Sequence, residues 1–375
     1  MESVSWISRM SNLVKSRGGI NLAQGIPGFD PPVELIQFLT SPMPSYRHQY
    51  AQGAGHPVLL ERIASLIDLQ SASQESSLLV LNGATEAISL VYLHEASRFG
   101  KEFTTMSIEP SYESYSHLPM VFGHRYIGFE QDPDGDLDLN AIEKTICEEK
   151  VNLFMLASPG NPYGRIYSES EIRGIDQICK NNNVVLLLDI VYRDIYYNQP
   201  PWHPISLLRE GLYLVGSFSK TLSVSGWRVG WLAGVEEGMK SISIMHDYTG
   251  LSVPHPLQHA IAGYLSQESR MERYLNTLRT TLKANYQYFS DELSSIGFCV
   301  SPAQGGYFIW AKLPELWPDG PTFAVDLYEK TQVAVVPGVH FYQGANRYIR
   351  FNIARGRSEL EAAINKIKTY SPLPL

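Results

Sequence analysis

The stretch LYLVGSFSKTLSVSGWRVG, residues 212–230, is the most informative part of this sequence. Its apolar start, residues 212–215, is typical of a buried strand, and a turn of small residues follows that presents Lys220. The amine of such a lysine can form a Schiff base if its surroundings lower its pKa from the reference value of about 10.4. The hydroxyls of Ser217 and Ser219 and the guanidinium of Arg228 are donors that suit a phosphate group. The stretch predicts a reactive lysine beside a phosphate site; the alternative interpretation is a surface lysine and a structural arginine.

Composition restricts the classes of partner. The 375 residues are 44% hydrophobic and 18% charged, which is the balance of a globular protein. The net charge is -8 and there is no basic block, so we expect neither nucleic acid nor a membrane as a partner. Residues 1–19 lack the continuous apolar core of a signal peptide, and no apolar run is long enough to span a bilayer.

The cysteines indicate a reducing compartment. Cys147, Cys179 and Cys299 lie far apart, are odd in number and lack metal-ligand spacing. This pattern predicts a cytoplasmic location, no disulfide framework and no metal site.

Apolar runs and amphipathic stretches alternate along the first two thirds of the chain. Strand-like runs occur at residues 77–81, 102–108, 153–157, 184–188 and 212–215, and helical patterns at 85–97 and 168–180. Strands separated by helices predict an α/β fold with a mostly parallel sheet and helices on both of its faces. In such sheets ligands bind beyond the carboxyl ends of the strands.

The pattern changes after residue 264. A long amphipathic helix is expected at residues 267–296, followed by short strands at 306–312, 333–336 and 348–353 and a closing helix at 358–369. We interpret this region as a smaller α+β domain to which the N-terminal segment returns. The predicted division is a large domain at residues 31–270 and a small domain made of residues 1–30 and 271–375.

Two turns after predicted strands can bind anions or polar groups. Gly83, Ala84 and Thr85 join a strand to a helix, where free backbone N–H groups, the helix dipole and the Thr85 hydroxyl would hold a phosphate. A tight turn with an ordinary helix cap is the alternative. Asn161 lies in a turn that prolines and glycines fix, so that its amide projects with a donor and an acceptor; a plain turn is the alternative there.

A carboxylate follows another predicted strand directly. Asp189 comes after the five apolar residues 184–188, and a buried carboxylate is costly unless a cation pairs with it. A protonated pyridine nitrogen is such a cation, and Tyr192, three residues on, could reach a phenolic oxygen on the same ring. The alternative is an aspartate that caps the next helix.

Taken together, these strand ends match one cofactor. They supply a Schiff-base lysine, a partner for a pyridinium nitrogen, a clamp for a phenolic oxygen and a cradle for a phosphate. Pyridoxal 5'-phosphate (PLP) carries all of these groups, and its ring acts as an electron sink for a substrate carbanion. We therefore predict PLP as the cofactor.

Over nearly its full length the chain resembles the class I/II aminotransferases, which are fold-type I PLP-dependent enzymes. The motifs similar to that family include Asn21-Leu22-Ala23-Gln24-Gly25, Gly83-Ala84-Thr85, Glu109-Pro110-Ser111-Tyr112, Gly305-Gly306-Tyr307-Phe308 and Tyr348-Ile349-Arg350-Phe351-Asn352. The family positions also include Asn161, Asp189, Tyr192, Ser217, Lys220 and Arg228. The resemblance implies a large domain whose mostly parallel sheet is of the seven-stranded type, a smaller α+β domain, and a homodimer with shared active sites.

The resemblance also implies further roles. Tyr112 would stack on the cofactor, and Tyr50 would reach the phosphate of the neighbouring subunit. Arg350, with Asn161 and the Gly25 backbone, would bind the substrate α-carboxylate. Lys220 would move the proton that the substrate Cα loses, so that an amino group passes from an L-amino acid to a 2-oxo acid.

Two other functions stay open at the level of sequence. The same cofactor could serve elimination, cyclisation, decarboxylation or oxidation, or the chain could bind PLP without turnover. Three residues depart from the family pattern: Ile190, Tyr163 and His340. We expect an apolar side-chain pocket that favours aromatic, methionine-like or other uncharged amino acids, lined by Ile26, Phe29, Tyr112 and Tyr307.

Overall fold

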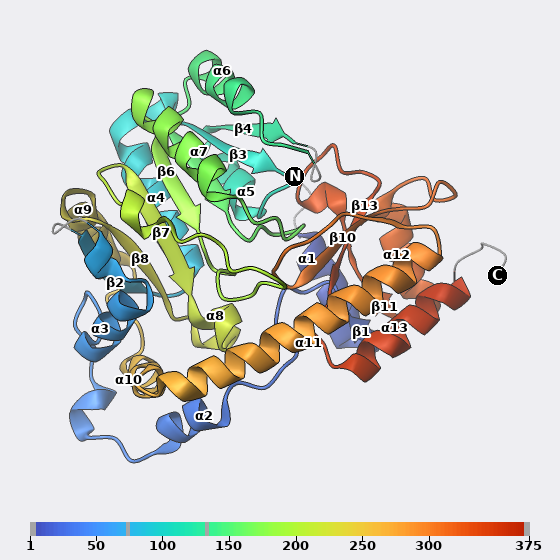
Figure 1. The fold of residues 1–375 in the computed structure, drawn as a ribbon, viewed down its shortest axis with the longest axis horizontal. Helices are drawn as coiled ribbons and strands as arrows, with labels where there is room; N and C mark the ends of the chain where they lie inside the picture. Colours follow the sequence, from blue (N-terminus) through green and yellow to red (C-terminus); the bar gives the residue numbers. More distant parts are fainter. Residues whose placement is uncertain (1–4, 73–75, 132–134, 371–375) are drawn as a thin grey trace.

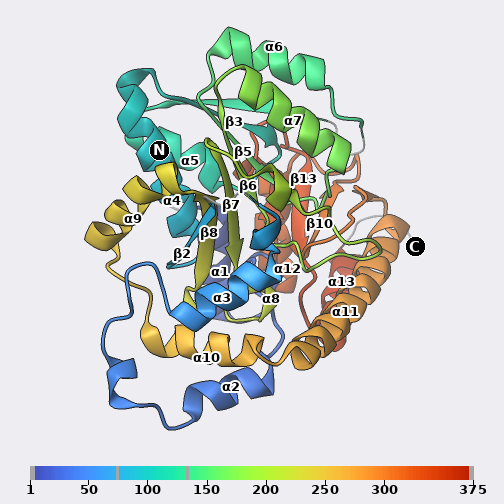
Figure 2. The same cartoon turned by 60° about the vertical axis from the view of Figure 1, so that its left-hand side comes forward.

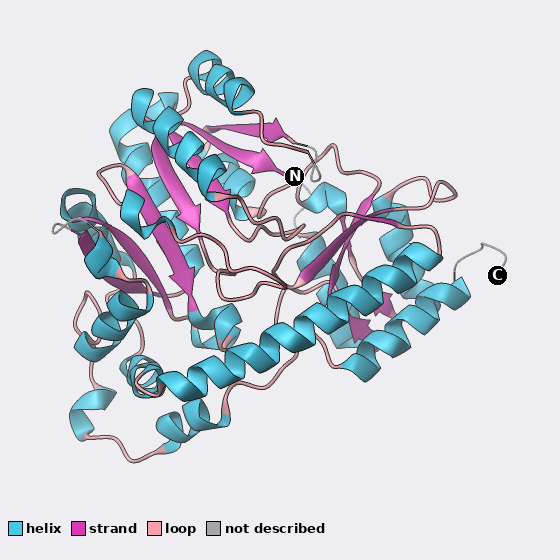
Figure 3. Cartoon of the chain, in the orientation of Figure 1, coloured by secondary structure: helices cyan, strands magenta, loops and turns pink. Residues whose placement is uncertain are grey.

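The computed structural model describes residues 5–72, 76–131 and 135–370. A seven-stranded sheet, a four-stranded sheet and a two-stranded sheet, magenta in Figure 3, organise these residues. The α-helices are α1 (Trp6–Arg17), α2 (Val33–Thr40), α3 (Pro57–Leu66), α4 (Ala84–Phe99), α5 (Ser114–Phe122), α6 (Leu139–Glu149), α7 (Glu169–Asn181), α8 (Phe218–Thr221), α9 (Glu236–Thr249), α10 (His255–Leu265), α11 (Glu268–Ser295), α12 (Gly320–Thr331) and α13 (Arg357–Tyr370).

The larger sheet has seven strands in the order β2-β8-β7-β6-β5-β3-β4. All neighbours are parallel except β8, which is antiparallel to β2 and to β7. The strands are β2 (Ser76–Leu81), β3 (Thr104–Glu109), β4 (Arg125–Glu130), β5 (Leu153–Ala157), β6 (Val185–Asp189), β7 (Leu212–Ser217) and β8 (Gly230–Val235). The mostly parallel seven-stranded sheet that the sequence predicts is therefore confirmed.

Helices cover both faces of this sheet (Figures 1 and 2) because the strands are apolar on both sides. Along β6, Leu186 and Leu188 pack with residues of α3, α6, α7 and α10, whereas Leu187 packs with residues of α4, α5 and α9. This alternation follows from the two-residue period of a strand.

Several predicted bounds differ from the structure. The sequence does not predict strands β4 and β8, since β4 is a partly exposed edge strand with charged ends and β8 carries two glycines. The strand predicted at residues 102–108 begins at Thr104, because Gly100–Glu102 form a 3-10 turn. The strand expected at residues 333–336 is two strands in two different sheets, β11 (Val333–Ala334) and β12 (Val336–Pro337).

The smaller sheet is antiparallel and has the order β12-β13-β10-β9. It contains β9 (Cys299–Val300), β10 (Phe308–Lys312) and β13 (Tyr348–Asn352), and its core includes residues of α11, α12 and α13. The N-terminal segment packs here as well: β1 (Ile20–Asn21) pairs with β11, and Met10 and Leu22 are buried in the same core.

Helix α11 extends along both halves of the molecule (Figure 1). Its residues Met271 and Leu275 belong to the core of the large sheet, and Phe289 and Leu293 belong to the core of the small sheet. The domain boundaries at residues 30 and 270 remain predictions, since one continuous helix serves both cores. Among the residues that the structure describes, no helix is long and apolar enough to cross a membrane.

Candidate active site

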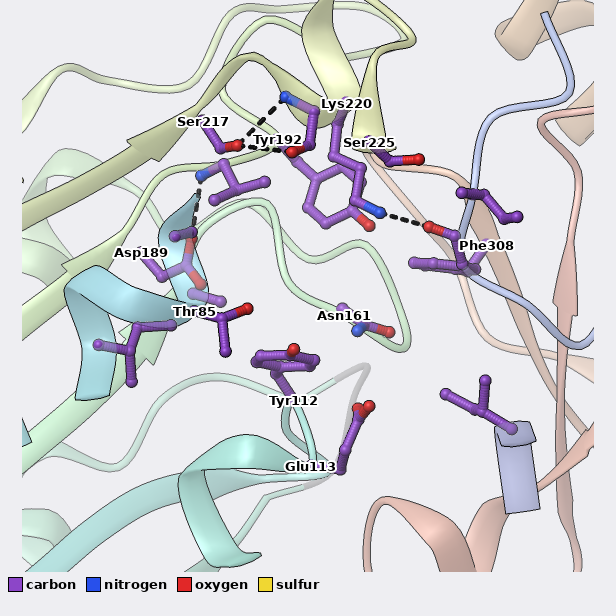
Figure 4. A pocket seen from close by; sticks show the side chains of 18 of the residues that line it. Thr85, Tyr112, Glu113, Asn161, Asp189, Tyr192, Ser217, Lys220, Ser225 and Phe308 are labelled. Atoms are coloured by element: carbon purple, nitrogen blue, oxygen red, sulfur yellow. Dashed lines mark hydrogen bonds between the residues drawn. The ribbon is translucent and has the colours of Figure 1, made fainter. Parts of the chain in front are cut away.

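A cavity of about 290 Å³ lies where the carboxyl ends of the large-sheet strands face the small sheet (Figure 4). It brings together most of the residues that the sequence singles out: Gly25, Ala84, Thr85, Tyr112, Asn161, Asp189, Tyr192, Ser217, Ser219, Lys220, Arg228 and Arg350. Two residues that the sequence predicts to bind the cofactor do not line the cavity. Gly83 packs against the guanidinium of Arg228, and the side chain of Tyr50 is 80% exposed. The cavity therefore assembles residues from strand ends that are distant in sequence.

Lys220 lies in α8, a single helical turn that follows β7, rather than in an irregular turn. Its Nζ donates a hydrogen bond to the carbonyl oxygen of Gly25, and the Tyr307 hydroxyl donates to the carbonyl oxygen of Lys220. Burial, and next the positive charge of Arg350, lowers the pKa of Lys220 to about 8. A larger share of the amine is thus neutral, which is the nucleophilic form.

The start of α4 leaves donors available at the cavity. Its N-cap residue is Gly83, with φ +82°, and no side chain of the described residues caps this end. A Cβ atom at position 83 would lie 2.6 Å from Nη2 of Arg228, so only glycine lets the two approach this closely. Arg228 and the first turn of α4, with Thr85, therefore form one concave surface rich in donors, as a phosphate requires.

Two serines complete the donor set on the β7 side. The Ser217 hydroxyl accepts a hydrogen bond from the Ser219 backbone N–H at 3.1 Å and lies 2.9 Å from the Ser219 hydroxyl (Figure 4). Both serines are buried and line the cavity. Their hydroxyls can rotate to donate to an anion that enters between them and Arg228.

Asp189 is buried at the carboxyl end of β6. Its two carboxylate oxygens accept hydrogen bonds from the Val191 backbone N–H at 3.0 Å and from the Tyr115 hydroxyl at 2.9 Å. Burial raises the pKa of Asp189 to about 6, and the Val191 and Tyr115 hydrogen bonds oppose this rise. The carboxylate is thus oriented by two donors while no described residue brings a cation into direct contact with it, which fits a pyridinium partner.

Two aromatic side chains bound the space between Asp189 and Lys220. Figure 4 shows the ring of Tyr112 extending across the lower side of this space, with Tyr192 on the opposite side. Tyr192 packs edge-on against Tyr307 at a centroid distance of 5.5 Å. Burial raises the pKa of the Tyr192 hydroxyl above its usual range, so it stays protonated and able to donate.

Arg350 is a buried cation at the other end of the cavity, on β13, with 1% of its surface exposed. Its Nη1 donates to the Asn161 side-chain oxygen at 2.9 Å and its Nη2 to the Ala23 carbonyl at 2.7 Å. The rings of Phe308 and Phe341 lie over the guanidinium at 4.1 and 4.6 Å. Both groups it donates to are neutral, and Nε has no acceptor among the described residues. A buried guanidinium in this state is suited to an incoming carboxylate.

Among the residues of the cavity region that sequence reasoning missed, two have polar groups that bear on the chemistry. Tyr115, which orients Asp189, and Glu113, whose carboxyl group lines the cavity, both lie within three residues of Tyr112. Their nearness to Tyr112 in the sequence was the available signal. The expected side-chain pocket also needs correction: Ile26 and Tyr112 line the cavity, but Phe29 and Tyr307 do not. Both pack in the apolar cluster whose members Tyr192 and Phe308 form part of the cavity wall.

The three departures from the family pattern have different environments. Ile190 is buried in the core of the large sheet, and Tyr163 is buried with its hydroxyl 3.0 Å from that of Tyr167. Neither lines the cavity. His340 is buried, with its Nε2 atom 3.8 Å from a carboxylate oxygen of Glu113. His340 is therefore the departure whose side chain lies at ion-pair distance from a residue that lines the cavity.

Comparison with known proteins identifies the family. The profile described as "Aminotransferase class I and II" matches residues 17–367. The chain belongs to the class I and II aminotransferases. It is 28% identical to a probable N-succinyldiaminopimelate aminotransferase, DapC, of Mycobacterium tuberculosis, with 98% of this chain and 96% of that protein covered. It is 27% identical to a probable aspartate aminotransferase of Methanocaldococcus jannaschii, with 93% and 92% covered.

Solved structures agree with this assignment. N-succinyldiaminopimelate aminotransferase from Mycobacterium tuberculosis superposes with a TM-score of 0.89 at 27% identity, over 98% of this chain and 97% of that one. A methionine aminotransferase from Escherichia coli, YbdL, shares the fold with a TM-score of 0.88 at 24% identity, over 98% and 97%. The chain is thus an aminotransferase of fold type I.

Enzymes of this family depend on PLP, and the cofactor prediction is confirmed at that level. The cavity fits this group on its own chemistry. It offers a lysine with a lowered pKa, a buried carboxylate with no cation in contact among the described residues, and the donor-rich concave surface beside Gly83.

Proposed function

We propose that this enzyme transfers the amino group of an L-amino acid with an uncharged, aromatic or methionine-like side chain to a 2-oxo acid. Family membership establishes the reaction class. The observation that carries the proposal for this chain is the buried Arg350, which has no carboxylate partner among the described residues and lies in one cavity with Lys220 and Asp189.

In this proposal the cofactor occupies the half of the cavity nearer to β6 and β7. Its phosphate would be held by the first turn of α4 after Gly83, with Ala84 and Thr85, and by Ser217, Ser219 and Arg228. Asp189 would pair with the pyridine nitrogen, oriented by Tyr115, and Tyr192 would donate to the phenolic oxygen. Tyr112 would stack on the ring, and Asn161 would contact its edge. When bound, PLP supplies an electron sink that makes the substrate Cα proton acidic.

Lys220 has two duties in this scheme. Its amine would hold the cofactor covalently in the resting enzyme, and after release it would take the proton from the substrate Cα and return it to the cofactor side. Both duties require a neutral amine at working pH. The lowered pKa of Lys220 supports them, because a catalytic base works best when its pKa is near the operating pH.

Arg350 would bind the α-carboxylate of every substrate. Its guanidinium offers parallel donors to two oxygens, and the Asn161 amide and the Gly25 backbone would complete the grip. Nη1 of Arg350 already donates to the Asn161 side-chain oxygen at 2.9 Å, so these two side chains are held together before the substrate arrives. Holding the carboxylate in this way fixes which bond at Cα faces Lys220.

We also propose a homodimer in which Tyr50 completes the partner's phosphate site. Tyr50 is 80% exposed, and other large apolar side chains are exposed along the same N-terminal and α9 segments, namely Val33, Ile244, Tyr248 and Leu251. Exposed apolar side chains of this kind are typical of an association surface.

A cytoplasmic location stays a prediction from the cysteine pattern.

The test is a single-turnover panel. Purified enzyme loaded with PLP is mixed with each L-amino acid in the absence of a 2-oxo acid, and the absorbance of the cofactor and the 2-oxo acid product are recorded. Uncharged aromatic and thioether amino acids should convert the cofactor to its amino form, and a 2-oxo acid should reverse the change. A panel in which only aspartate and glutamate react would overturn the proposed side-chain class.

A further inference from the structure

The substrate end of the cavity contains a carboxylate that the proposed function does not use. Glu113 immediately precedes α5 and lines the cavity together with Asn161 and Arg350. Figure 4 shows its carboxyl group directed toward the same open space as the Asn161 amide. The side chains of Ile7 and Ile26 line this cavity too. The Glu113 carboxylate thus shares the cavity with apolar side chains.

The side chain of His340 lies next to this carboxylate. The His340 ring is buried, with 3% of its side chain exposed, and its Nε2 lies 3.8 Å from Oε1 of Glu113, which is an ion-pair distance. The other oxygen, Oε2, is buried and has no donor among the described residues. Because the Glu113 side chain is 23% exposed while Oε2 is buried, a ligand N–H or O–H group would reach the carboxylate at Oε1.

Glu113 is negatively charged in this setting. Burial alone would raise its pKa, but the interaction with His340 and the positive charge of Arg350 outweigh burial and lower the pKa of Glu113. Glu113 is nevertheless not the ion-pair partner of Arg350, whose Nη atoms donate to Asn161 and Ala23. The carboxylate therefore acts on whatever else enters the cavity.

We propose that Glu113, positioned by His340, selects the substrate by its side chain. It weakens the binding of side chains that end in a carboxylate and strengthens the binding of those that end in an N–H or O–H donor. This inference rests on the proposed function, since it assumes that Arg350 holds the α-carboxylate. Within the proposed amino acids with uncharged side chains, it favours those whose apolar side chain ends in a hydrogen-bond donor. It also predicts that dicarboxylic 2-oxo acids are poor amino acceptors.

Two physical effects produce this selectivity. Two carboxylates brought together in a cavity with little water repel each other strongly, and juxtaposing like charges is an effective way to exclude a ligand. A neutral donor, by contrast, forms a charge-assisted hydrogen bond with the carboxylate. The α-carboxylate of the same substrate escapes the repulsion because Arg350 neutralises it.

The test uses three carboxylic acids that lack an amino group and cannot react. Glutarate carries a second carboxylate, 3-indolepropionate carries an N–H donor, and 3-phenylpropionate carries neither. Their dissociation constants are measured by isothermal titration calorimetry against the holoenzyme, its Glu113→Gln variant and a Glu130→Gln control. The control removes the same charge from an exposed position at the end of β4.

In the Glu113→Gln variant we expect glutarate to bind at least about tenfold more tightly relative to 3-phenylpropionate, and 3-indolepropionate to lose part of its advantage. 3-Phenylpropionate itself should change by less than about threefold. The Glu130→Gln control should leave all three ratios unchanged. Single-turnover rates with glutamate, tryptophan and phenylalanine should follow the same order.

The positioning role of His340 has its own test. His340→Gln keeps a donor directed at Glu113 and should preserve the ligand ratios, whereas His340→Ala should shift them toward those of Glu113→Gln. A purely structural histidine would lower the melting temperature in both variants without changing the ratios, and that result would remove His340 from the proposal.

Failure of this inference is distinguishable from failure of the proposed function. If Glu113→Gln alters all three acids equally, Glu113 is a counter-charge to Arg350 and the selectivity proposal is wrong. If its ratios match those of the control, Glu113 has no role in selection. If Arg350→Lys leaves the affinity for all three acids intact, the assumed α-carboxylate site is itself wrong.

Discussion

The buried amine of Lys220 should destabilise the cofactor-free protein at neutral pH. Its pKa of about 8 lies below the ordinary lysine value of 10.5, so the folded state binds this proton less tightly than the unfolded state does. The difference of about 2.5 pH units corresponds to about 3 kcal/mol at 1.36 kcal/mol per unit. Replacing the amine by an apolar side chain of similar length, Lys220→Met, removes that destabilisation.

The sign of the pH dependence follows from which state holds the proton. Below pH 8 both states are protonated and the full penalty is present. Between pH 8 and 10.5 the unfolded state binds more protons than the folded state, so the stability of the unmodified protein rises with pH. Above pH 10.5 the amine is neutral in both states and the penalty is gone. The advantage of Lys220→Met should therefore shrink by about 3 kcal/mol across this window.

The assay is urea unfolding of both proteins after removal of the cofactor, at one protein concentration and in buffers without phosphate, from pH 7 to pH 10.5. Differences in packing between lysine and methionine are the same at every pH and cancel in this comparison. Lys15→Met, at an exposed position of α1, serves as the control. A Lys220→Met advantage that does not change with pH would refute the reasoning, because Lys220 would then titrate alike in both states.

Three further predictions concern the site. Asp189→Ala should lower the rate of substrate Cα–H exchange far more than it lowers cofactor affinity, because the carboxylate keeps the pyridine nitrogen protonated; near-normal exchange in deuterated water would exclude this role. Arg350→Lys should weaken amino acids and 2-oxo acids alike, on the order of a thousandfold, because lysine lacks the forked donors; unchanged substrate affinity with a lower melting temperature would instead indicate a structural arginine. Mixing Tyr50→Phe with Lys220→Ala subunits should yield hybrid dimers with one site free of both changes and with normal cofactor affinity; no recovery despite subunit exchange would show that Tyr50 does not act across the interface.

Sequence patterns predicted the large sheet well because its strands are buried on both faces. A short, continuous apolar run such as residues 184–188 is typical of a strand that has no solvent-facing side. The same reasoning failed for β4, whose charged ends and partial exposure at the sheet edge hide the strand signal. It also failed at residues 333–336, where one apolar run serves two different sheets.

The residues of the candidate site were likewise predicted only in part from the sequence. Asp189, Asn161 and Lys220 could be predicted because each closely follows a buried strand, and parallel strands deliver their carboxyl ends to one edge of a sheet. Phe29 and Tyr307 were expected to line an apolar pocket together with Ile26 and Tyr112. The structure packs both in the cluster that includes Tyr192 and Phe308, without a place in the cavity lining, since an aromatic ring can pack on either side of a cavity wall.

The sequence by itself determined the fold class and the family, and it predicted most of the groups that we propose to face the cofactor, because these depend on strand order and on residues adjacent to strand ends. Only the tertiary structure decided which side chains meet across that framework. It paired Tyr115 with Asp189, set Gly83 against Arg228 and brought His340 from the small sheet to Glu113 beside the large one. Such contacts join segments whose separation in the chain carries no periodic signal, and they arise when two cores pack together.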